Sequence, residues 1–130
     1  MMARIGQRNT APEIAVRRVL HAFGARFRLH RRDLPGTPDI VLPGRRLALL
    51  VHGCFWHRHK GCRFAYMPKT RIEFWRAKFA RNVSRDREVE RALGSLGWRV
   101  AIIWECETED PAALARRLKK VLARFRLRRD

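Results

Sequence analysis

Acidic residues are scarce in this 130-residue sequence. It contains 12 Asp and Glu against 30 Lys and Arg, which gives a formal net charge of +18. Only five of the thirty basic residues are lysines, so 25 are arginines, whose planar guanidinium groups suit phosphate oxygens. Such a surplus of one sign repels itself unless a polyanion is nearby, and we expect nucleic acid to be that partner. A basic surface that reflects only an arginine-rich composition is the alternative.

The sequence also lacks a long hydrophobic run. No stretch approaches the roughly 20 apolar residues that span a bilayer, and the opening MMARIGQRNT contains no apolar signal segment. We therefore expect no membrane partner and a cytoplasmic location. Apolar residues still make up 46% of the chain, enough for one folded domain over residues 1–130, with a basic tail from Arg124 to Arg129.

Cysteine is rare, and its count is odd. Cys54, Cys62 and Cys106 cannot all pair in a closed disulfide framework, so free thiols or metal ligands are expected. Two of them lie in the segment HGCFWHRHKGC (52–62). Within it, Cys54, His59 and Cys62 have the spacing C-x4-H-x2-C, and a fourth soft ligand would complete a tetrahedral zinc site. Cys106 is the remaining cysteine that can supply it, and buried free thiols are the alternative.

Hydrophobic periodicity and turn residues predict the element order α-β-β-β-α-β-α, a mixed sheet flanked by helices. The predicted elements are a helix opened by a capping box at 10–13 and ended by Gly24, strands at 26–31, 39–42, 47–51 and 99–104, a helix opened by a second capping box at 70–73 and reaching about Leu96, and a last helix after Asp110-Pro111.

The predicted hairpin places one carboxylate beside a buried strand. If the chain reverses near Pro43-Gly44, paired residue numbers sum to roughly 90, allowing a slip of one. Asp39 then lies beside Leu50 and Val51, where the second strand ends. A carboxylate there can bind a hard cation together with a main-chain oxygen, which suits Mg²⁺. A turn residue after Pro38 is the alternative for Asp39.

The Pro-Asp pair at 38–39, followed by a hairpin, resembles the PD-(D/E)xK nuclease core. In that core the next strand supplies a second acid and a lysine, but here it reads LALLVHG (47–53) and supplies neither. A nuclease would therefore have to use His57 or His52, which lie outside the zinc set. A neutral imidazole near a metal-bound phosphate can take a proton from water, with its tautomer fixed by a carboxylate. Asp86 is one candidate partner, and a solvated helix acid is the alternative.

Four further residues have both structural and functional interpretations. Glu13 is first a helix-capping residue and second a candidate ligand of a metal ion or water. Phe55 and Trp56 follow an expected zinc ligand, and rigid aromatics on a basic protein can stack on or wedge between bases. Trp75 on the long helix is a candidate third member. Packing around the zinc site is the alternative for all three aromatics.

Together these residues resemble the very short patch repair (Vsr) endonuclease family. The resemblance covers about Asn9 to Cys106. Its motifs, in family order, are PGTPD (35–39), HGCFWHRHKGC (52–62), TRIEFW (70–75), NVSRDR (82–87) and GWRVAIIWEC (97–106). It implies an α/β (α+β) fold with a restriction-endonuclease-like PD-(D/E)xK-type core and a structural zinc site. It also implies Mg²⁺-dependent nicking beside the thymine of a T:G mismatch left by deamination of 5-methylcytosine.

The resemblance also implies a role for each matching position. Asp39 matches the metal-binding aspartate, and Val51 matches a position whose main-chain carbonyl is the second Mg²⁺ ligand. His57 matches the general base, and Asp86 matches the acid that orients it. The remaining matches are His52 to a second active-site histidine, Glu13 to an acid near the water and metals, Cys54, His59, Cys62 and Cys106 to the zinc ligands, and Phe55, Trp56 and Trp75 to the aromatics that intercalate beside the mismatch.

Two alternative functions share these residues. One is an endonuclease or nickase of other specificity, and the other is a non-catalytic, zinc-stabilised DNA-binding module. The expected partner is double-stranded DNA that carries a T:G mismatch, with mismatch-repair proteins as further candidates. We expect the protein to act as a monomer.

Overall fold

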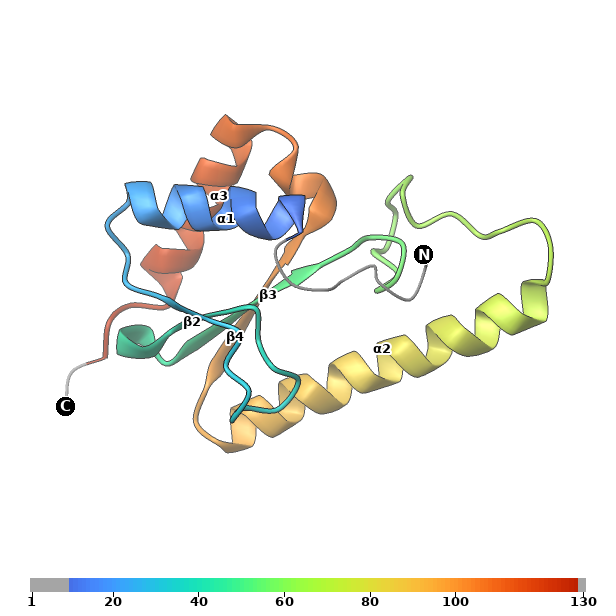
Figure 1. The fold of residues 1–130 in the computed structure, drawn as a ribbon, viewed down its shortest axis with the longest axis horizontal. Helices are drawn as coiled ribbons and strands as arrows, with labels where there is room; N and C mark the ends of the chain where they lie inside the picture. Colours follow the sequence, from blue (N-terminus) through green and yellow to red (C-terminus); the bar gives the residue numbers. More distant parts are fainter. Residues whose placement is uncertain (1–9, 129–130) are drawn as a thin grey trace.

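The computed structural model describes residues 10–128, so Asn9, at the start of the family resemblance, and Arg129 of the basic tail lie outside the described residues (Figure 1). The elements are α1 (Ala11–Ala22), β1 (Arg28–Leu29), β2 (Ile40–Leu42), β3 (Leu47–His52), α2 (Ile72–Ser95), β4 (Arg99–Trp104) and α3 (Pro111–Arg124), with short 3-10 helices η2 (Pro43–Arg45) and η3 (Glu105–Thr108). The predicted element order is confirmed. None of the helices in this described part of the chain combines the length and apolarity that crossing a bilayer requires.

The four strands form one mixed sheet in the order β1-β2-β3-β4. β2 and β3 are antiparallel, with Ile40 opposite Leu49 and Leu42 opposite Leu47, so the partner numbers sum to 89. This is the predicted register within its allowed slip. β3 and β4 are parallel, and their pairing ends with His52 beside Trp104. Nearly every residue of β3 is buried, as a strand covered on both faces requires.

Helices cover both faces of the sheet (Figure 1). On one face, α1 and α3 pack against alternate residues of the three longer strands. On the other face, the C-terminal part of α2 packs against the residues in between. The first cluster consists of Val16, Leu20, Ile40, Leu42, Leu47, Leu49, Ala101, Ile103, Leu114, Leu118 and Val121, and the second of Leu34, Val41, Ala48, Leu93 and Trp98.

The helix starts differ in how they are capped. Thr10 Oγ1 accepts a hydrogen bond from the Glu13 N–H, and Asp110 Oδ1 accepts one from the Ala112 N–H, as predicted for α1 and α3. The capping box predicted at 70–73 is wrong. Arg71 is the N-cap of α2, in a left-handed conformation with φ of 54°, and no side chain caps this helix start.

The long helix α2 extends beyond the sheet. Of its 24 residues only Phe79 and Leu93 are buried, and Leu93 belongs to the second core cluster. The N-terminal half leads away from the sheet and meets the segment 53–71 that follows β3 (Figure 1). The N-terminal half of α2 and the segment 53–71 together carry much of the candidate site.

The strand predicted at 26–31 is shorter than expected, because β1 covers only Arg28 and Leu29 and both are exposed. The left-handed backbone of His30, with φ of 48°, ends the strand. At the other end of the chain, the basic tail is hydrogen-bonded as far as Arg128, whose N–H donates to the Gly44 carbonyl oxygen at 2.8 Å.

Gly36 allows the loop between β1 and β2 to approach α2. Its φ is +73°, and a Cβ atom added there would lie 2.6 Å from Val89 Cγ1. Only glycine combines this backbone conformation with so close an approach. The contact holds the loop that leads into Asp39 against the helix that carries Asp86.

Replacing Gly36 with alanine is expected to destabilise the protein more than replacing Gly24 with alanine. Both glycines have φ of +73°, but a Cβ atom at Gly24 would meet nothing within 4 Å. Gly24→Ala therefore reports backbone strain alone. The extra loss in Gly36→Ala, about 1–3 kcal/mol of unfolding free energy, reports crowding against Val89. Urea denaturation measures the difference, and equal losses would contradict the proposed contact.

Candidate active site and metal centre

Asp39 lies directly before β2, beside the end of β3. Its Oδ2 atom accepts a hydrogen bond from the Val51 N–H at 3.0 Å, so the predicted proximity of these two residues is confirmed. Burial raises the pKa of the Asp39 carboxyl group, and the Val51 N–H only partly offsets that effect. A bound cation would stabilise the charged form of such a desolvated carboxylate.

His57 and Asp86 form a hydrogen-bonded pair between the loop after β3 and the helix α2. The distance from His57 Nδ1 to Asp86 Oδ2 is 2.7 Å. When the imidazole is neutral, Nδ1–H donates to the carboxylate and Nε2 keeps a lone pair that can accept a proton. One turn before Asp86, Asn82 donates from Nδ2 to the Trp56 carbonyl oxygen at 3.4 Å, which holds the loop against α2.

His52, the last residue of β3, packs against the ring of His57. The ring centroids are 3.8 Å apart and the planes differ by 9°, while the edge of Trp104 contacts His52 from another side at 5.4 Å. Burial, together with the neighbouring His57, lowers the pKa of His52 to about 4. His52 is therefore neutral at pH 7 and gives His57 an uncharged surface.

Glu13 is buried at 1% exposure, although it belongs to the first turn of α1. Its Oε2 atom lies 2.9 Å from His30 Nε2 and also accepts a hydrogen bond from the Arg17 guanidinium. Single ligand atoms of Glu13, His30 and Asp39 all lie within 4.8 Å of one another. His30 is a site residue that the sequence does not reveal, because local patterns do not predict the pairing of residues 28–29 with 40–41 that brings His30 opposite Asp39.

These groups face a common cavity of about 710 Å³. It brings together the predicted catalytic-centre residues and two of the predicted DNA-contacting aromatics. They are Glu13, Asp39, Val51, His52, His57 and Asp86, with Phe55 and Trp56. Two acidic side chains, a neutral histidine and a histidine–carboxylate pair that line one cavity can bind a hydrated cation and accept a proton.

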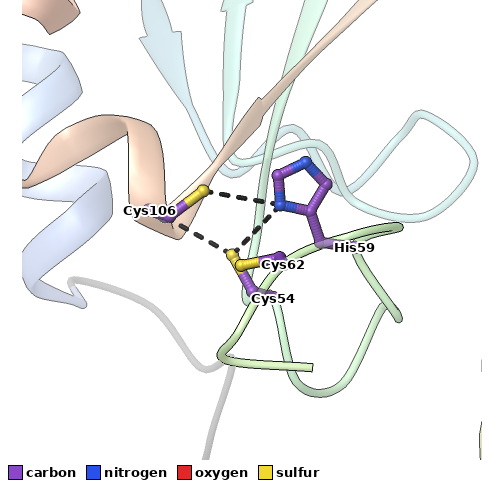
Figure 2. Close-up of side chains that lie close together, drawn as sticks. All are labelled: Cys54, His59, Cys62 and Cys106. Carbon is purple, nitrogen blue, oxygen red and sulfur yellow. Dashed lines mark hydrogen bonds between the residues drawn. The ribbon is translucent and has the colours of Figure 1, made fainter. Parts of the chain in front are cut away.

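A second group of possible ligands is shown in Figure 2, and chain neighbours of two of its members, Gly53, Phe55 and Glu105, line the cavity. Ligand atoms of Cys54, His59, Cys62 and Cys106 all lie within 4.8 Å of one another. The sheet explains why residues so far apart in sequence meet. His52 pairs with Trp104 in parallel, and Cys54 and Cys106 each follow two residues later, so both leave the sheet at the same edge.

The donors of this group suit a tetrahedral metal ion. His59 Nδ1 lies 3.6 Å from Cys54 Sγ and 3.4 Å from Cys106 Sγ. Tetrahedral bonds of about 2.3 Å to sulfur and 2.0 Å to nitrogen would separate these atoms by about 3.5 Å. Burial raises the pKa of the Cys54 thiol to about 12, and a bound cation would take the place of that proton. The clustering favours a metal site over independent buried thiols.

Phe55, Trp56 and Trp75 form an aromatic cluster with Phe79 of α2. Phe55 lies 5.0 Å from Trp56, 5.7 Å from Trp75 and 5.1 Å from Phe79, measured between ring centroids. The three predicted aromatics are half-buried, and Phe55 and Trp56 of the loop contact Trp75 of α2. Each therefore keeps part of its ring accessible.

Arg58 is not among the site residues predicted from the sequence, but it cross-links the loop that carries Phe55 and Trp56. Its guanidinium lies 3.9 Å from the ring centre of Phe79, a cation–π contact, and donates to the carbonyl oxygens of Phe55, Ala65 and Tyr66. These bonds join the two ends of the loop around the candidate metal centre. The sequence gives no sign of this role, because Arg58 is one of 25 arginines.

Comparison with known proteins relates the chain to DNA endonucleases. The family model for DNA mismatch endonuclease Vsr matches residues 1–63. The type II nicking enzyme V.XorIIP of Xanthomonas oryzae pv. oryzae (strain KACC10331 / KXO85) is 55% identical over 122 residues, 94% of this chain and 89% of the relative. The DNA mismatch endonuclease Vsr of Escherichia coli (strain K12) is 45% identical over 105 residues, 81% of this chain and 67% of the relative.

One solved structure has the same fold. The catalytic domain of the homing endonuclease I-Bth0305I superposes with a TM-score of 0.61 at 20% identity, and the match covers 90% of this chain and 98% of that domain. The predicted nuclease-type α/β class, with a mixed sheet flanked by helices, is confirmed.

His52→Gln is expected to reduce the loss of stability at acidic pH. The pKa of His52 is about 4 in the folded protein and near 6.5 when unfolded, so the unfolded state takes up the proton first as the pH falls. This residue thus costs no stability above pH 6.5 and about 2 kcal/mol at pH 5. Urea denaturation at pH 5 and above pH 6.5, with equal metal content, measures the unfolding free energy of both proteins. The decrease in unfolding free energy between the two pH values should be smaller for the variant. An equal loss in both proteins would contradict a neutral, buried His52.

Proposed function

Because the chain belongs to the Vsr family of DNA endonucleases, we propose that it nicks one strand of duplex DNA beside the thymine of a T:G mismatch. The Escherichia coli relative is named a DNA mismatch endonuclease, and V.XorIIP is named a type II nicking enzyme. Strand cleavage is common to both names. The mismatch, its thymine and its origin in deaminated 5-methylcytosine are the parts that we propose.

One observation carries the proposed chemistry: the His57–Asp86 pair and the Asp39 carboxylate line the same cavity. We assign His57 as the general base, because Nε2 can take a proton from water that attacks a phosphate. Asp86 holds the Nδ1–H tautomer and stabilises the imidazolium that forms. Asp39 and the main-chain oxygen of Val51 would hold Mg²⁺, which neutralises charge on the phosphate.

His52 and Glu13 support this centre in different ways. The neutral ring of His52 stacks on His57, which restricts the orientation of the base without adding a competing positive charge. Glu13 supplies a second carboxylate within 4.8 Å of Asp39, close enough to bind a water molecule of the same hydrated cation. Strand β3 reads LALLVH and carries neither the second acid nor the lysine of the PD-(D/E)xK core. In this proposal His52, His57 and Glu13 take the place of those two residues.

We assign Zn²⁺ to the site formed by Cys54, His59, Cys62 and Cys106. Three thiolates and one imidazole fill a tetrahedral shell and leave no position for water, which is typical of a structural zinc site. The ion would tie the loop after β3 to the end of β4. His57, Phe55 and Trp56 lie on that loop and would thereby be held in fixed positions against Trp75 and Phe79 of α2.

The same loop and the start of α2 present the surface that we propose to contact the mismatch. Phe55, Trp56 and Trp75 keep accessible ring area beside the cavity, and rigid aromatics can enter between bases where stacking is weakest. The net charge of +18 attracts the phosphate backbone on either side. We expect double-stranded DNA to be the only obligatory partner, with mismatch-repair proteins as further candidates.

A second candidate function is a nickase of another specificity. The name of V.XorIIP, the relative at 55% identity, favours it, since that name mentions nicking without a mismatch. The cavity chemistry would be the same. Only the base pair beside the cut would differ.

The protein is expected to nick a T:G duplex much faster than a C:G duplex of the same sequence, in the presence of Mg²⁺. The wobble pair is less well stacked, so wedging aromatics into it costs less than opening a matched step. Single-turnover cleavage of end-labelled duplexes measures both rates. Equal rates would support the nickase of other specificity, and binding without any cleavage would support a non-catalytic module.

Two aspartate variants provide the control for this assay. Asp39→Asn keeps the shape of the side chain but removes its charge and is expected to slow nicking by about 100-fold or more. Asp33→Asn alters an exposed aspartate of the same loop, paired with Arg31, and should nick like the unchanged protein. Comparable rates in both variants would contradict the role of Asp39.

Purified protein is expected to contain about one zinc ion per chain. Cys106→Ser should lower that content, because a hydroxyl is a poor zinc ligand, and should destabilise the loop after β3. His21→Ala, a change on an exposed face of α1, should leave the content unchanged. Elemental analysis gives the stoichiometry. Folded protein free of zinc would refute the assignment.

A further inference from the structure

His30 lies opposite Asp39 at the end of the β1–β2 pair. Leu29 pairs with Ile40, and one residue further the His30 N–H donates to the Asp39 carbonyl oxygen at 3.0 Å. Side chains directly opposite in an antiparallel pair project to the same face. The imidazole is therefore near the Asp39 carboxylate, with ligand atoms of His30, Asp39 and Glu13 all within 4.8 Å of one another.

The backbone of His30 is held in an uncommon conformation. Its φ of 48° is in the left-handed region, where a Cβ atom crowds the backbone and where glycine fits without strain. Non-glycine residues held in this region concentrate at functional sites, because the surrounding structure must impose the conformation. His30 is half-buried, so its imidazole lies at the border of the core and not within it.

The imidazole contacts a carboxylate that is almost fully buried. His30 Nε2 lies 2.9 Å from Glu13 Oε2, and Arg17 donates to the same oxygen from the next turn of α1. Donors arriving from two elements restrict rotation of the Glu13 carboxylate about its last bond. Glu13 and Asp39 both line the cavity, so the orientation of Glu13 decides what it presents there.

We propose that His30 is a positioning residue for the endonuclease reaction: its Nε2–H donates to Glu13 Oε2 and holds that carboxylate beside Asp39. The inference rests on the proposed function, in which both carboxylates serve one hydrated divalent cation. His30 acts through Glu13 and has no contact with the reacting phosphate. Residues that orient metal-site ligands in this way typically contribute 10–100-fold to metal affinity or activity.

The first experiment replaces His30 with glycine and with glutamine. Glycine removes the imidazole and also relieves the left-handed strain, so the His30→Gly protein should remain folded. It should nick DNA about 10–100-fold more slowly. Glutamine places an amide N–H at a similar reach, so His30→Gln should recover most of the rate. His21→Ala, an exposed histidine change on α1, is the matched control and should nick normally.

A double-mutant cycle separates a positioning role from a general structural one. If His30 acts through Glu13, then His30→Gly should cause no further loss of rate in a Glu13→Gln background. Mn²⁺ binding, followed by electron paramagnetic resonance without DNA, gives a readout that does not depend on cleavage. His30→Gly should weaken Mn²⁺ binding by about tenfold, again only when Glu13 is present.

Three outcomes would overturn the proposal: an unchanged rate and Mn²⁺ affinity in His30→Gly, losses that add fully to those of Glu13→Gln, or no recovery in His30→Gln. Failure of the mismatch assignment is distinguishable from these. If the unchanged protein cuts a matched duplex instead of T:G, the cycle is run on that duplex. If it cuts no duplex, the Mn²⁺ affinities still decide the role of His30.

Discussion

The parallel pairing of β3 with β4, next to the antiparallel β2–β3 hairpin, is the constraint on which the candidate site depends. The hairpin brings Asp39 to the Val51 amide, and the parallel pair makes His52 and Trp104 neighbours. The segments that follow β3 and β4 leave the sheet at the same edge, which is also the edge where β2 begins. The candidate metal centre and the cavity are therefore adjacent because they share the same strand ends, and a slip of one residue in either pairing would separate them.

A series of contacting rings connects the two centres. His57 stacks on His52, the edge of Trp104 meets His52, and the other end of the series is His59, which stacks on Trp104 at 4.2 Å. A metal ion on His59 Nδ1 would restrain one end, and Asp86 restrains the other. A ring that is packed between others cannot tilt without moving its neighbours. The orientation of His57, the proposed base, therefore depends on its own loop and on His52 at the end of β3.

The fold of this protein does not by itself define a specificity. The same sheet and helices occur in a homing endonuclease catalytic domain at 20% identity, so very different sequences form this core. In this chain the segment 53–71 carries Arg58, Phe55 and Trp56, and the outlying half of α2 carries Trp75 and Phe79. A loop held by soft ligands and cation–π contacts can change its exposed side chains while the buried strands, and the chemistry at their ends, stay the same.

The sequence by itself determined the element order, the β2–β3 register and the grouping of ligand residue types, because strand burial, turn residues and short spacings are local properties. Local rules failed at the ends of two elements: α2 begins after Arg71 without the expected capping box, and β1 ends at Leu29, before the left-handed His30. Only the tertiary structure placed Cys106 beside Cys54, paired Asp86 with His57 and joined His30 to Glu13. Each of those contacts joins elements that are far apart in the sequence. Their distance in space depends on strand order and helix packing, and local sequence patterns do not predict either.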